Sequence, residues 1–302
     1  MKNGQPPDQF KSGYVTIAGR PNTGKSTLLN RILGQKVAII SPKPNTTRNR
    51  ITGIKTMPGA QIVFLDTPGI HLAKKELNKR MVEKAVQAAF EADLLYLMVQ
   101  ADGPWVEEDF YTFSALEKTG KPMILVINRI DLVEKQTVLP VIDQSQKLFP
   151  FKEIVPISAL RGDGIEELLK ATLPYLPEGE PLFPQDMVTD QAERSWAAEL
   201  VREKVINLTR EEIPYSCAVV VTEWQESAKL IRIRAVIYVE RDSQKGIIIG
   251  RGGAMVKKIG QAAREEIEQI LGAKIFLELQ VKVSKDWTKK PEMIKRLLGV
   301  RS

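Results

Sequence analysis

The stretch GRPNTGKS, residues 19–26, follows a short apolar run at residues 14–18 and precedes leucines at helical spacing in residues 28–33. In a loop of this pattern, backbone N–H groups point inward as an anion cradle, and the following helix adds its positive end. Lys25 then reaches the outer phosphates, and the Ser26 hydroxyl binds Mg²⁺. The sequence therefore predicts a strand, a phosphate loop and a helix. The expected nucleotide contacts are Gly19, Arg20, Pro21, Asn22, Thr23, Gly24, Lys25 and Ser26.

Apolar runs alternate with helical patterns through the first half of the chain. Strands are predicted at residues 62–65, 94–99, 123–127 and 154–157, and helices at residues 76–91 and 107–117. Strands that alternate with helices form mostly parallel sheets covered on both faces. We therefore predict an α/β domain with a mostly parallel sheet, whose ligand lies at the carboxyl ends of the strands.

Length and proline content indicate two domains. A chain of 302 residues exceeds the usual domain size of about 150 residues. Pro177, Pro181 and Pro184 lie close together, and proline at this density disfavours helix and sheet. We predict an N-terminal extension at residues 1–13, a nucleotide-binding domain at 14–176, a linker at 177–190, a second domain at 191–283 and a tail at 284–302.

Composition and charge limit the class of protein. Hydrophobic residues make up 43% and charged residues 27% of the chain, which is usual for a globular protein. The net charge is +7, and residues 245–302 hold 13 Lys and Arg against 6 Asp and Glu. This basic segment suits a polyanionic partner, with a solvated surface as the alternative.

Cys217 and His71 are the only residues of their types. An internal disulfide and cysteine- or histidine-rich metal sites are therefore excluded. Cys217 lies in an apolar run, where we expect a small buried side chain rather than a nucleophile. The N-terminal segment has no apolar signal, and no stretch approaches the roughly 18 apolar residues of a membrane span, so we expect a cytosolic protein.

A second motif, DTPG, follows the strand predicted at residues 62–65. Its aspartate can bind the hydration shell of magnesium, and its glycine amide can meet the terminal phosphate. The polar segment PNTTRNR, residues 44–50, precedes it. We interpret that segment as a mobile switch in which Thr47 binds magnesium only with the third phosphate present, the alternative being a plain solvated loop. Further nucleotide contacts are expected from Asp66, Thr67, Pro68, Gly69 and Ile70.

The base is predicted from the sequence NRID, which follows the strand at residues 123–127. A carboxylate accepts two protons from the N1 and N2 edge of guanine, whereas adenine presents a lone pair there and is rejected. A Ser-Ala pair follows the next predicted strand and completes an ordered set. The predicted ligands are GTP and GDP, contacted by Asn128, Arg129, Ile130, Asp131, Ser158 and Ala159.

With these motifs in this order, residues 14–176 resemble a Ras-like GTP-binding domain of the translation-factor-related class. The resemblance implies GTP hydrolysis with magnesium held by Ser26, Thr47 and Asp66. It implies catalytic roles for Lys25, Thr47, Gly69 and Asn22.

Two residues depart from the pattern of that class. Arg129 replaces the usual lysine, and its longer side chain can also stack on the base. Ile70 stands where Ras-type enzymes carry a glutamine that orients water, and an isoleucine cannot hydrogen-bond to water. Related GTPases with an asparagine like Asn22 bind potassium in the position of an arginine finger. We therefore predict stimulation by K⁺.

A second glycine loop, GRGG at residues 250–253, lies between helices predicted at 244–249 and 254–271. Small glycines let a sugar-phosphate backbone approach, and the helix start supplies N–H donors. The order helix, strand, strand, helix, helix, strand resembles a type II KH domain, an α+β module that clamps about four nucleotides of single strand. A plain helix-to-helix turn is the alternative. The expected RNA contacts are Gly250, Arg251, Gly252, Gly253, Lys257 and Lys258.

The whole chain resembles the Era family of GTPases from residue 14 to residue 283. This resemblance implies binding to small-subunit ribosomal RNA near its 3′ end and a part in maturing the small ribosomal subunit. It also implies weak peripheral association with the cytoplasmic face of the inner membrane. We expect a monomer.

Two other functions stay open at this point. One is an RNA-binding scaffold whose nucleotide domain binds GTP but barely hydrolyses it, an alternative motivated by Ile70. The other is a protein-binding signalling GTPase with a KH-shaped adaptor, against which the basic C-terminal segment argues.

Overall fold

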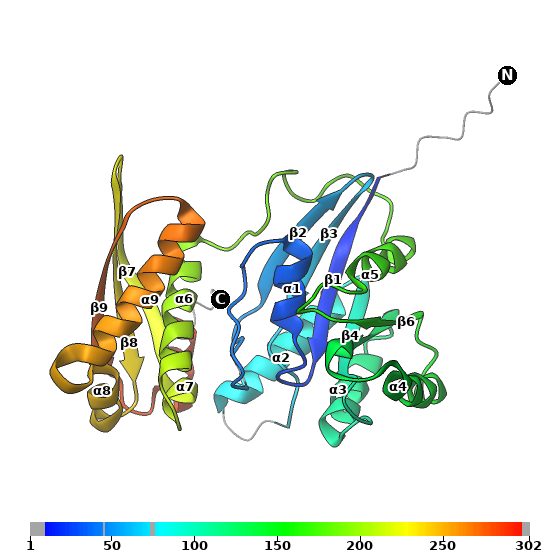
Figure 1. Ribbon diagram of the computed structural model, residues 1–302, viewed down its shortest axis with the longest axis horizontal. Helices are drawn as coiled ribbons and strands as arrows, with labels where there is room; N and C mark the ends of the chain where they lie inside the picture. Colours follow the sequence, from blue (N-terminus) through cyan, green and yellow to red (C-terminus); the bar gives the residue numbers. More distant parts are fainter. Residues whose placement is uncertain (1–9, 45, 73–75, 298–302) are drawn as a thin grey trace. The chain divides into compact units, whose positions relative to one another are not determined.

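The computed structural model describes residues 10–44, 46–72 and 76–297, which form two compact units (Figure 1). The N-terminal unit holds most of the first 190 residues. The C-terminal unit holds the chain from Gln191 onward. It also takes in short stretches of the first half, among them Ile39–Thr46.

The N-terminal unit is an α/β domain around a six-stranded sheet of order β2-β3-β1-β4-β5-β6. Neighbouring strands are parallel except for β2 and β3, which are antiparallel. The strands are β1 (Lys11–Gly19), β2 (Ile51–Met57), β3 (Ala60–Asp66), β4 (Leu94–Gln100), β5 (Met123–Asn128) and β6 (Glu153–Ile157). The predicted fold class is thereby confirmed.

Helices cover both faces of this sheet. Leu28 and Leu168, from α1 and α5, join the core on one face. Ala85, Phe113 and Val141, from α2, α3 and α4, join the core on the other face. The helices are α1 (Lys25–Leu33), α2 (Glu76–Glu91), α3 (Glu107–Glu117), α4 (Lys135–Leu148) and α5 (Ile165–Thr172), with single turns η1 (Ile130–Leu132) and η2 (Leu173–Tyr175).

The edge strand β2 is absent from the sequence-based prediction, because its sequence ITGIKTM has no apolar run. Tertiary packing explains the strand: it pairs with β3 and lies against α1, where a Cβ on Gly53 would come within 2.6 Å of Leu29 Cδ1 and displace the end of that side chain. The prediction is also wrong about residues 11–13, which start β1 rather than belong to an extension. They pair with Ala60, Gln61 and Ile62 of β3.

Residues 177–190 contain no helix or strand, and they pack along β2 and β3. Gln61 is fully buried; its amide nitrogen donates to the Phe183 carbonyl, and its carbonyl accepts from the Phe183 N–H, both at 2.9 Å. Ile54 N donates to Val188 O at 2.8 Å. The predicted linker is therefore hydrogen-bonded to β2 and β3 of the N-terminal unit as far as Val188.

The C-terminal unit is an α+β domain with a three-stranded sheet of order β7-β8-β9. β7 and β8 are antiparallel, and β8 and β9 are parallel. Its main elements are α6 (Glu193–Leu208), α7 (Ile213–Ser216), β7 (Ala218–Ser227), β8 (Leu230–Val239), α8 (Asp242–Ile249), η3 (Arg251–Gly253), α9 (Ala254–Leu271) and β9 (Ile275–Val283). This order agrees with the predicted KH arrangement, with the short α7 added.

The segment after β9 has more structure than its sequence suggests. It forms η4 (Trp287–Lys289) and α10 (Pro291–Leu297). Trp287 is fully buried and donates its indole N–H to Ser216 O at 2.8 Å. Cys217 is also buried, as expected of a structural cysteine. Over the described parts of the chain, no helix is long and apolar enough to cross a membrane.

Candidate functional site

The phosphate loop joins β1 to α1, as predicted. Gly24 has a φ of 99°, and a Cβ there would lie 2.3 Å from Asn128 Nδ2, so this position requires glycine. Asn22 also has a left-handed φ of 64°. The buried Lys25 ammonium donates to the carbonyls of Gly19 at 3.0 Å and Arg20 at 2.8 Å. The backbone of the phosphate loop thus fixes the position of the Lys25 ammonium beside the predicted phosphate site.

Burial perturbs two opposite charges beside this loop. It lowers the pKa of Lys25 to about 8, an effect that the Asp66 carboxylate partly opposes. It raises the pKa of Asp66 to about 6, opposed by hydrogen bonding from Ser26 and by the Lys25 charge. Perturbed pairs of this kind concentrate at functional sites. A phosphate near Lys25 and a cation near Asp66 would each favour the charged form.

Three side chains fit a magnesium ion. Ser26 Oγ donates to Asp66 Oδ2 at 2.7 Å, and it lies 2.9 Å from Thr47 Oγ1. Asp66 is fully buried, and its Oδ1 has no hydrogen-bond partner among the described residues. Hydroxyl and carboxylate oxygens are the donors that Mg²⁺ prefers. The unpartnered buried oxygen is the observation that favours a cation here.

The predicted switch segment is not a plain solvated loop. Thr47 is 9% exposed and Arg48 only 2% exposed. These two side chains are therefore packed and not solvated. Asn45 lies outside the described residues.

The DTPG loop lies directly against the phosphate loop. A Cβ on Gly69 would lie 2.7 Å from Pro21 N, and Ile70 N donates to Gly19 O at 3.2 Å. Thr67 Oγ1 donates to Ile17 O at 3.0 Å, which ties the loop to β1. His71 Nδ1 lies 2.9 Å from Gly69 O, so the ring contacts the same loop.

Ile70 is fully buried in the core on the face of the sheet that α3 covers. Thr112 of α3 donates its hydroxyl to Ile70 O at 3.1 Å. The isoleucine thus anchors the loop by packing, and its side chain belongs to the core. The backbone of Gly69 and Ile70, and not the Ile70 side chain, faces the phosphate loop.

Asn128 ties three motifs together at the carboxyl end of the sheet. Its Nδ2 donates to Thr23 O at 2.7 Å, and its Oδ1 accepts from Ala159 N at 2.9 Å. The Asp131 carboxylate accepts from Ser158 Oγ at 2.7 Å, and its side chain is 6% exposed. The predicted guanine-reading residues are therefore fixed by the phosphate loop and by the turn after β6.

Arg129 keeps contact with the phosphate loop despite replacing a lysine. Its Nη2 donates to Asn22 O at 2.6 Å, and its Nη1 lies 3.8 Å from Asp102 Oδ2. The backbone of Arg129 has a left-handed φ of 72°. Ile130 and Asp131 follow in η1.

Sequence reasoning missed a polar network behind the phosphate loop. Arg20 donates through Nε to Asp109 Oδ1 at 3.0 Å and through Nη2 to Gln100 Oε1 at 2.6 Å. Gln100 Nε2 in turn donates to Asn22 O at 2.9 Å. Gln100 is the last residue of β4. Its position at the carboxyl end of a predicted strand could have marked it as a residue near the ligand.

The GRGG loop joins α8 to α9 and has an open surface. Gly250, Gly252 and Gly253 have φ values of 72°, 58° and 81°. A Cβ on Gly252 or Gly253 would meet no atom within 4 Å. The cationic side chains predicted to contact RNA, Arg251, Lys257 and Lys258, are all exposed.

The helices beside this loop leave some isoleucines exposed. Ile248 is buried, but Ile247 is 48% exposed and Ile270 is 41% exposed. Neither of these two is part of the buried core of the C-terminal unit. Gly250 requires glycine for a steric reason as well, because a Cβ there would lie 2.8 Å from Met255 Cβ.

Comparison with known proteins matches a family model to each half of the chain. A family model described as "50S ribosome-binding GTPase" matches residues 14–129, and a KH domain model matches residues 212–288. A GTPase Era of Geotalea uraniireducens is 52% identical over 288 residues, which cover 95% of this chain and 97% of that protein. A GTPase Era of Geobacter metallireducens is 54% identical over 290 residues, with the same coverage. The chain belongs to the Era family of GTPases. This Era-family protein is a GTPase, as its motifs predicted.

Solved structures of Era proteins share the fold of this Era-family GTPase. One is Aquifex aeolicus Era bound to GDP and aluminium tetrafluoride, with a TM-score of 0.93 and 49% identity. Another is Era in complex with MgGDPNP and nucleotides 1506–1542 of 16S ribosomal RNA, with the same TM-score and identity. Each alignment covers 96% of this chain and 99% of the other.

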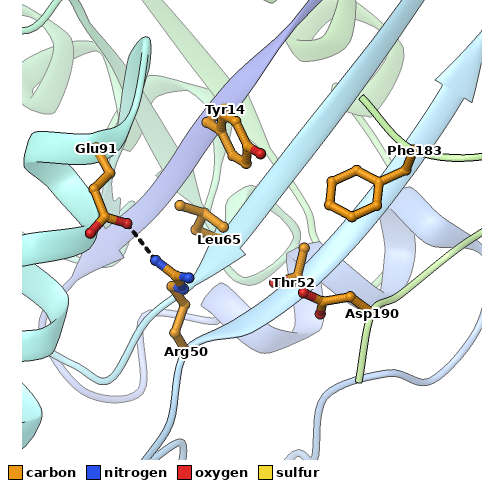
Figure 2. A pocket seen from close by; sticks show the side chains of 7 residues that line it. All are labelled: Tyr14, Arg50, Thr52, Leu65, Glu91, Phe183 and Asp190. Atoms are coloured by element: carbon orange, nitrogen blue, oxygen red, sulfur yellow. Dashed lines mark hydrogen bonds and ion pairs between the residues drawn. The ribbon is translucent and has the colours of Figure 1, made fainter. Parts of the chain in front are cut away.

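A separate pocket of about 220 Å³ lies between the sheet and the linker of the N-terminal unit (Figure 2). Arg50 and Glu91 pair at one rim, 2.5 Å apart, and Phe183 and Asp190 of the linker stand on the opposite side. Tyr14, Thr52 and Leu65 complete the lining. None of these residues is among the predicted nucleotide contacts.

Proposed function

We propose that this GTPase hydrolyses magnesium-bound GTP and binds small-subunit ribosomal RNA near its 3′ end during assembly and maturation of the small subunit. One observation supports the proposal above all. The chain contains both a full set of guanine-nucleotide motifs at one edge of a sheet and an open GRGG loop. Era proteins similar over nearly the whole chain support the RNA partner. They outweigh the 50S description, whose model covers residues 14–129 only.

In this proposal each predicted residue has a role set by its contacts. Lys25 and the backbone N–H groups of the phosphate loop, other than at Pro21, bind the phosphates, and the Gly69 N–H meets the terminal one. Ser26, Thr47 and Asp66 hold Mg²⁺, which neutralises phosphate charge when bound. Asn128 and Asp131 select guanine. The Ile70 side chain is buried and cannot orient the attacking water. Catalysis in this proposal therefore rests on the charges and N–H groups of the loops, which stabilise the transition state.

Potassium is the predicted additional source of positive charge. Asn22 is exposed at the tip of the phosphate loop in a left-handed conformation. We expect GTP turnover in K⁺ to exceed turnover in Na⁺ by at least about tenfold, because a cation there stabilises developing charge. Steady-state hydrolysis in matched chloride buffers measures the effect. Asn22→Gly keeps the left-handed backbone and should abolish the difference, while equal rates in both salts for the wild type would contradict the prediction.

RNA binding is predicted to depend on the GRGG loop. Gly252→Asp places a carboxylate on an open surface with a left-handed φ of 58°. We expect its affinity for a single-stranded RNA with the 3′-end sequence of small-subunit rRNA to fall at least about tenfold, because the new charge repels phosphate.

Gly272→Asp is the matched control for that measurement. Gly272 ends α9 with a φ of 63° and equally open space, so the charge and backbone changes are the same. Fluorescence anisotropy with both variants decides the question. Equal losses in the two variants would show a general charge effect and refute a specific clamp at the GRGG loop.

The proposal includes a monomer in the cytoplasm, where GTP and ribosomal RNA meet. Peripheral association with the inner membrane stays a prediction of the family resemblance.

A further inference from the structure

The backbone of the DTPG loop is held on both sides of its last peptide groups. Ile70 N donates to Gly19 O at 3.2 Å, and Ile70 O accepts from the Thr112 hydroxyl at 3.1 Å. His71 Nδ1 lies 2.9 Å from Gly69 O. The Gly69 N–H, by contrast, makes no hydrogen bond to any residue that the structure describes. An unused N–H beside the phosphate loop is the kind of donor that a terminal phosphate requires.

Helix α3 of the N-terminal unit contacts both the DTPG loop and the phosphate loop. Asp109 and Thr112 lie three residues apart on this helix and therefore share a face. Both are buried, at 3% and 0% exposure. Asp109 Oδ1 accepts from Arg20 Nε of the phosphate loop at 3.0 Å, while Thr112 donates to Ile70 O. One helix face thus holds the two loops at a fixed spacing.

The Thr112 hydroxyl does not need a partner outside its own helix. Its Oγ1 also lies 2.8 Å from Glu108 O, one turn earlier, which can accept its single proton. Threonines inside helices commonly make this bond alone. The contact with Ile70 O therefore serves the loop rather than the helix, because it gives a buried carbonyl of the loop a donor.

We propose that Thr112 is a positioning residue for GTP hydrolysis. By donating to Ile70 O from the helix that also holds the phosphate loop, it keeps the Gly69 N–H at the terminal phosphate. The buried Ile70 side chain cannot orient water, so the rate depends closely on where this N–H lies. The inference rests on the proposed function, in which the Gly69 N–H meets the terminal phosphate.

The test is single-turnover GTP hydrolysis with Mg²⁺ by the full chain carrying Thr112→Val, which keeps the side-chain shape without the hydroxyl. We expect the rate to fall about tenfold, the effect of losing one hydrogen bond in the transition state. GDP lacks the terminal phosphate, so its affinity should change less than about twofold. Thr112→Ser keeps the hydroxyl and should recover most of the rate.

Thr119→Val is the matched control for the loss of a hydroxyl. The Thr119 hydroxyl donates to Leu116 O at 2.7 Å at the other end of α3, and this variant should keep the wild-type rate. A purely structural role for Thr112 predicts another pattern. Thr112→Val would then lower the unfolding temperature and leave the hydrolysis rate at the wild-type value, and that result overturns the proposal.

A double-mutant cycle tests whether Thr112 acts through Gly69. Gly69→Ala already displaces the N–H, so adding Thr112→Val should slow this variant less than about twofold further. A tenfold effect in both backgrounds overturns the proposal, because Thr112 then acts elsewhere. Normal hydrolysis by Gly69→Ala would refute the role of Gly69 in the proposed function. Normal hydrolysis by Thr112→Val beside a slow Gly69→Ala would overturn this inference alone.

If Thr112→Val does not fold, Thr112→Cys takes its place, because a thiol is a weaker hydrogen-bond donor than a hydroxyl. Its rate should lie about threefold or more below that of Thr112→Ser, which lacks the same methyl group. Equal rates for these two variants overturn the proposal.

Discussion

Asp131→Asn is expected to change the base that the protein binds from guanine to xanthine. The carboxylate accepts two protons from guanine, and Ser158 Oγ holds it in place at 2.7 Å. A carboxamide offers one acceptor and one donor, so it leaves the guanine amino group unpaired. Xanthine carries a carbonyl at that position and restores the pair. We expect GTP affinity to fall about 10³-fold or more, and xanthosine triphosphate to become the preferred ligand.

Competition binding against a fluorescent nucleotide measures both affinities. Asp143→Asn is the matched control, because Asp143 is an exposed residue of α4, and it should bind GTP like the wild type. A general loss of the fold would weaken GTP without strengthening xanthosine triphosphate. Loss of GTP binding by a variant that is folded by circular dichroism, with no gain for xanthosine triphosphate, would therefore contradict direct recognition of guanine by Asp131.

Gly69→Ala is expected to reduce GTP hydrolysis at least about a hundredfold, because the DTPG loop must move to accommodate a methyl group. The added Cβ would lie 2.7 Å from Pro21 N and 2.9 Å from Pro21 Cα, both backbone atoms that cannot rotate away. The Gly69 amide would then leave its predicted place at the terminal phosphate. GDP lacks that phosphate, so we expect GDP affinity to change less than about threefold.

Single-turnover hydrolysis with saturating protein separates the chemical step from binding. Gly103→Ala is the control, because a Cβ at Gly103 meets no atom within 4 Å, and it should keep the wild-type rate. Normal hydrolysis by Gly69→Ala would show that the loop tolerates displacement and that its amide is dispensable. Weakened GDP binding would place the damage in the phosphate loop itself.

The nucleotide motifs were readable from sequence because their chemistry is local. A phosphate cradle needs a run of free N–H groups, a glycine with positive φ at Gly24 and a lysine, all within eight residues. Parallel strands then place the motifs after β1, β3, β5 and β6 at one edge of the sheet. The GRGG loop was recognisable for the same reason, since its glycines and cations are adjacent in the chain.

Other features depended on partners that the sequence does not place. The chain alone shows an isoleucine after DTPG, but packing against α3 decides that the Ile70 side chain is core. Edge strand β2 and the strap at residues 177–190 are stabilised by contacts with residues far away in sequence, such as Leu29 and Gln61.

Arg202 is the clearest case of a burial that appears only in three dimensions. In the sequence it is an ordinary charge within a helical pattern, for which a solvated position is the usual expectation. Its burial and its bond to Thr46, 156 residues away, come from tertiary packing. Local backbone chemistry thus allowed the nucleotide and its phosphate contacts to be predicted from the sequence. Long-range packing decided which charged side chains are buried, because a buried charge acquires its partner only when distant segments meet.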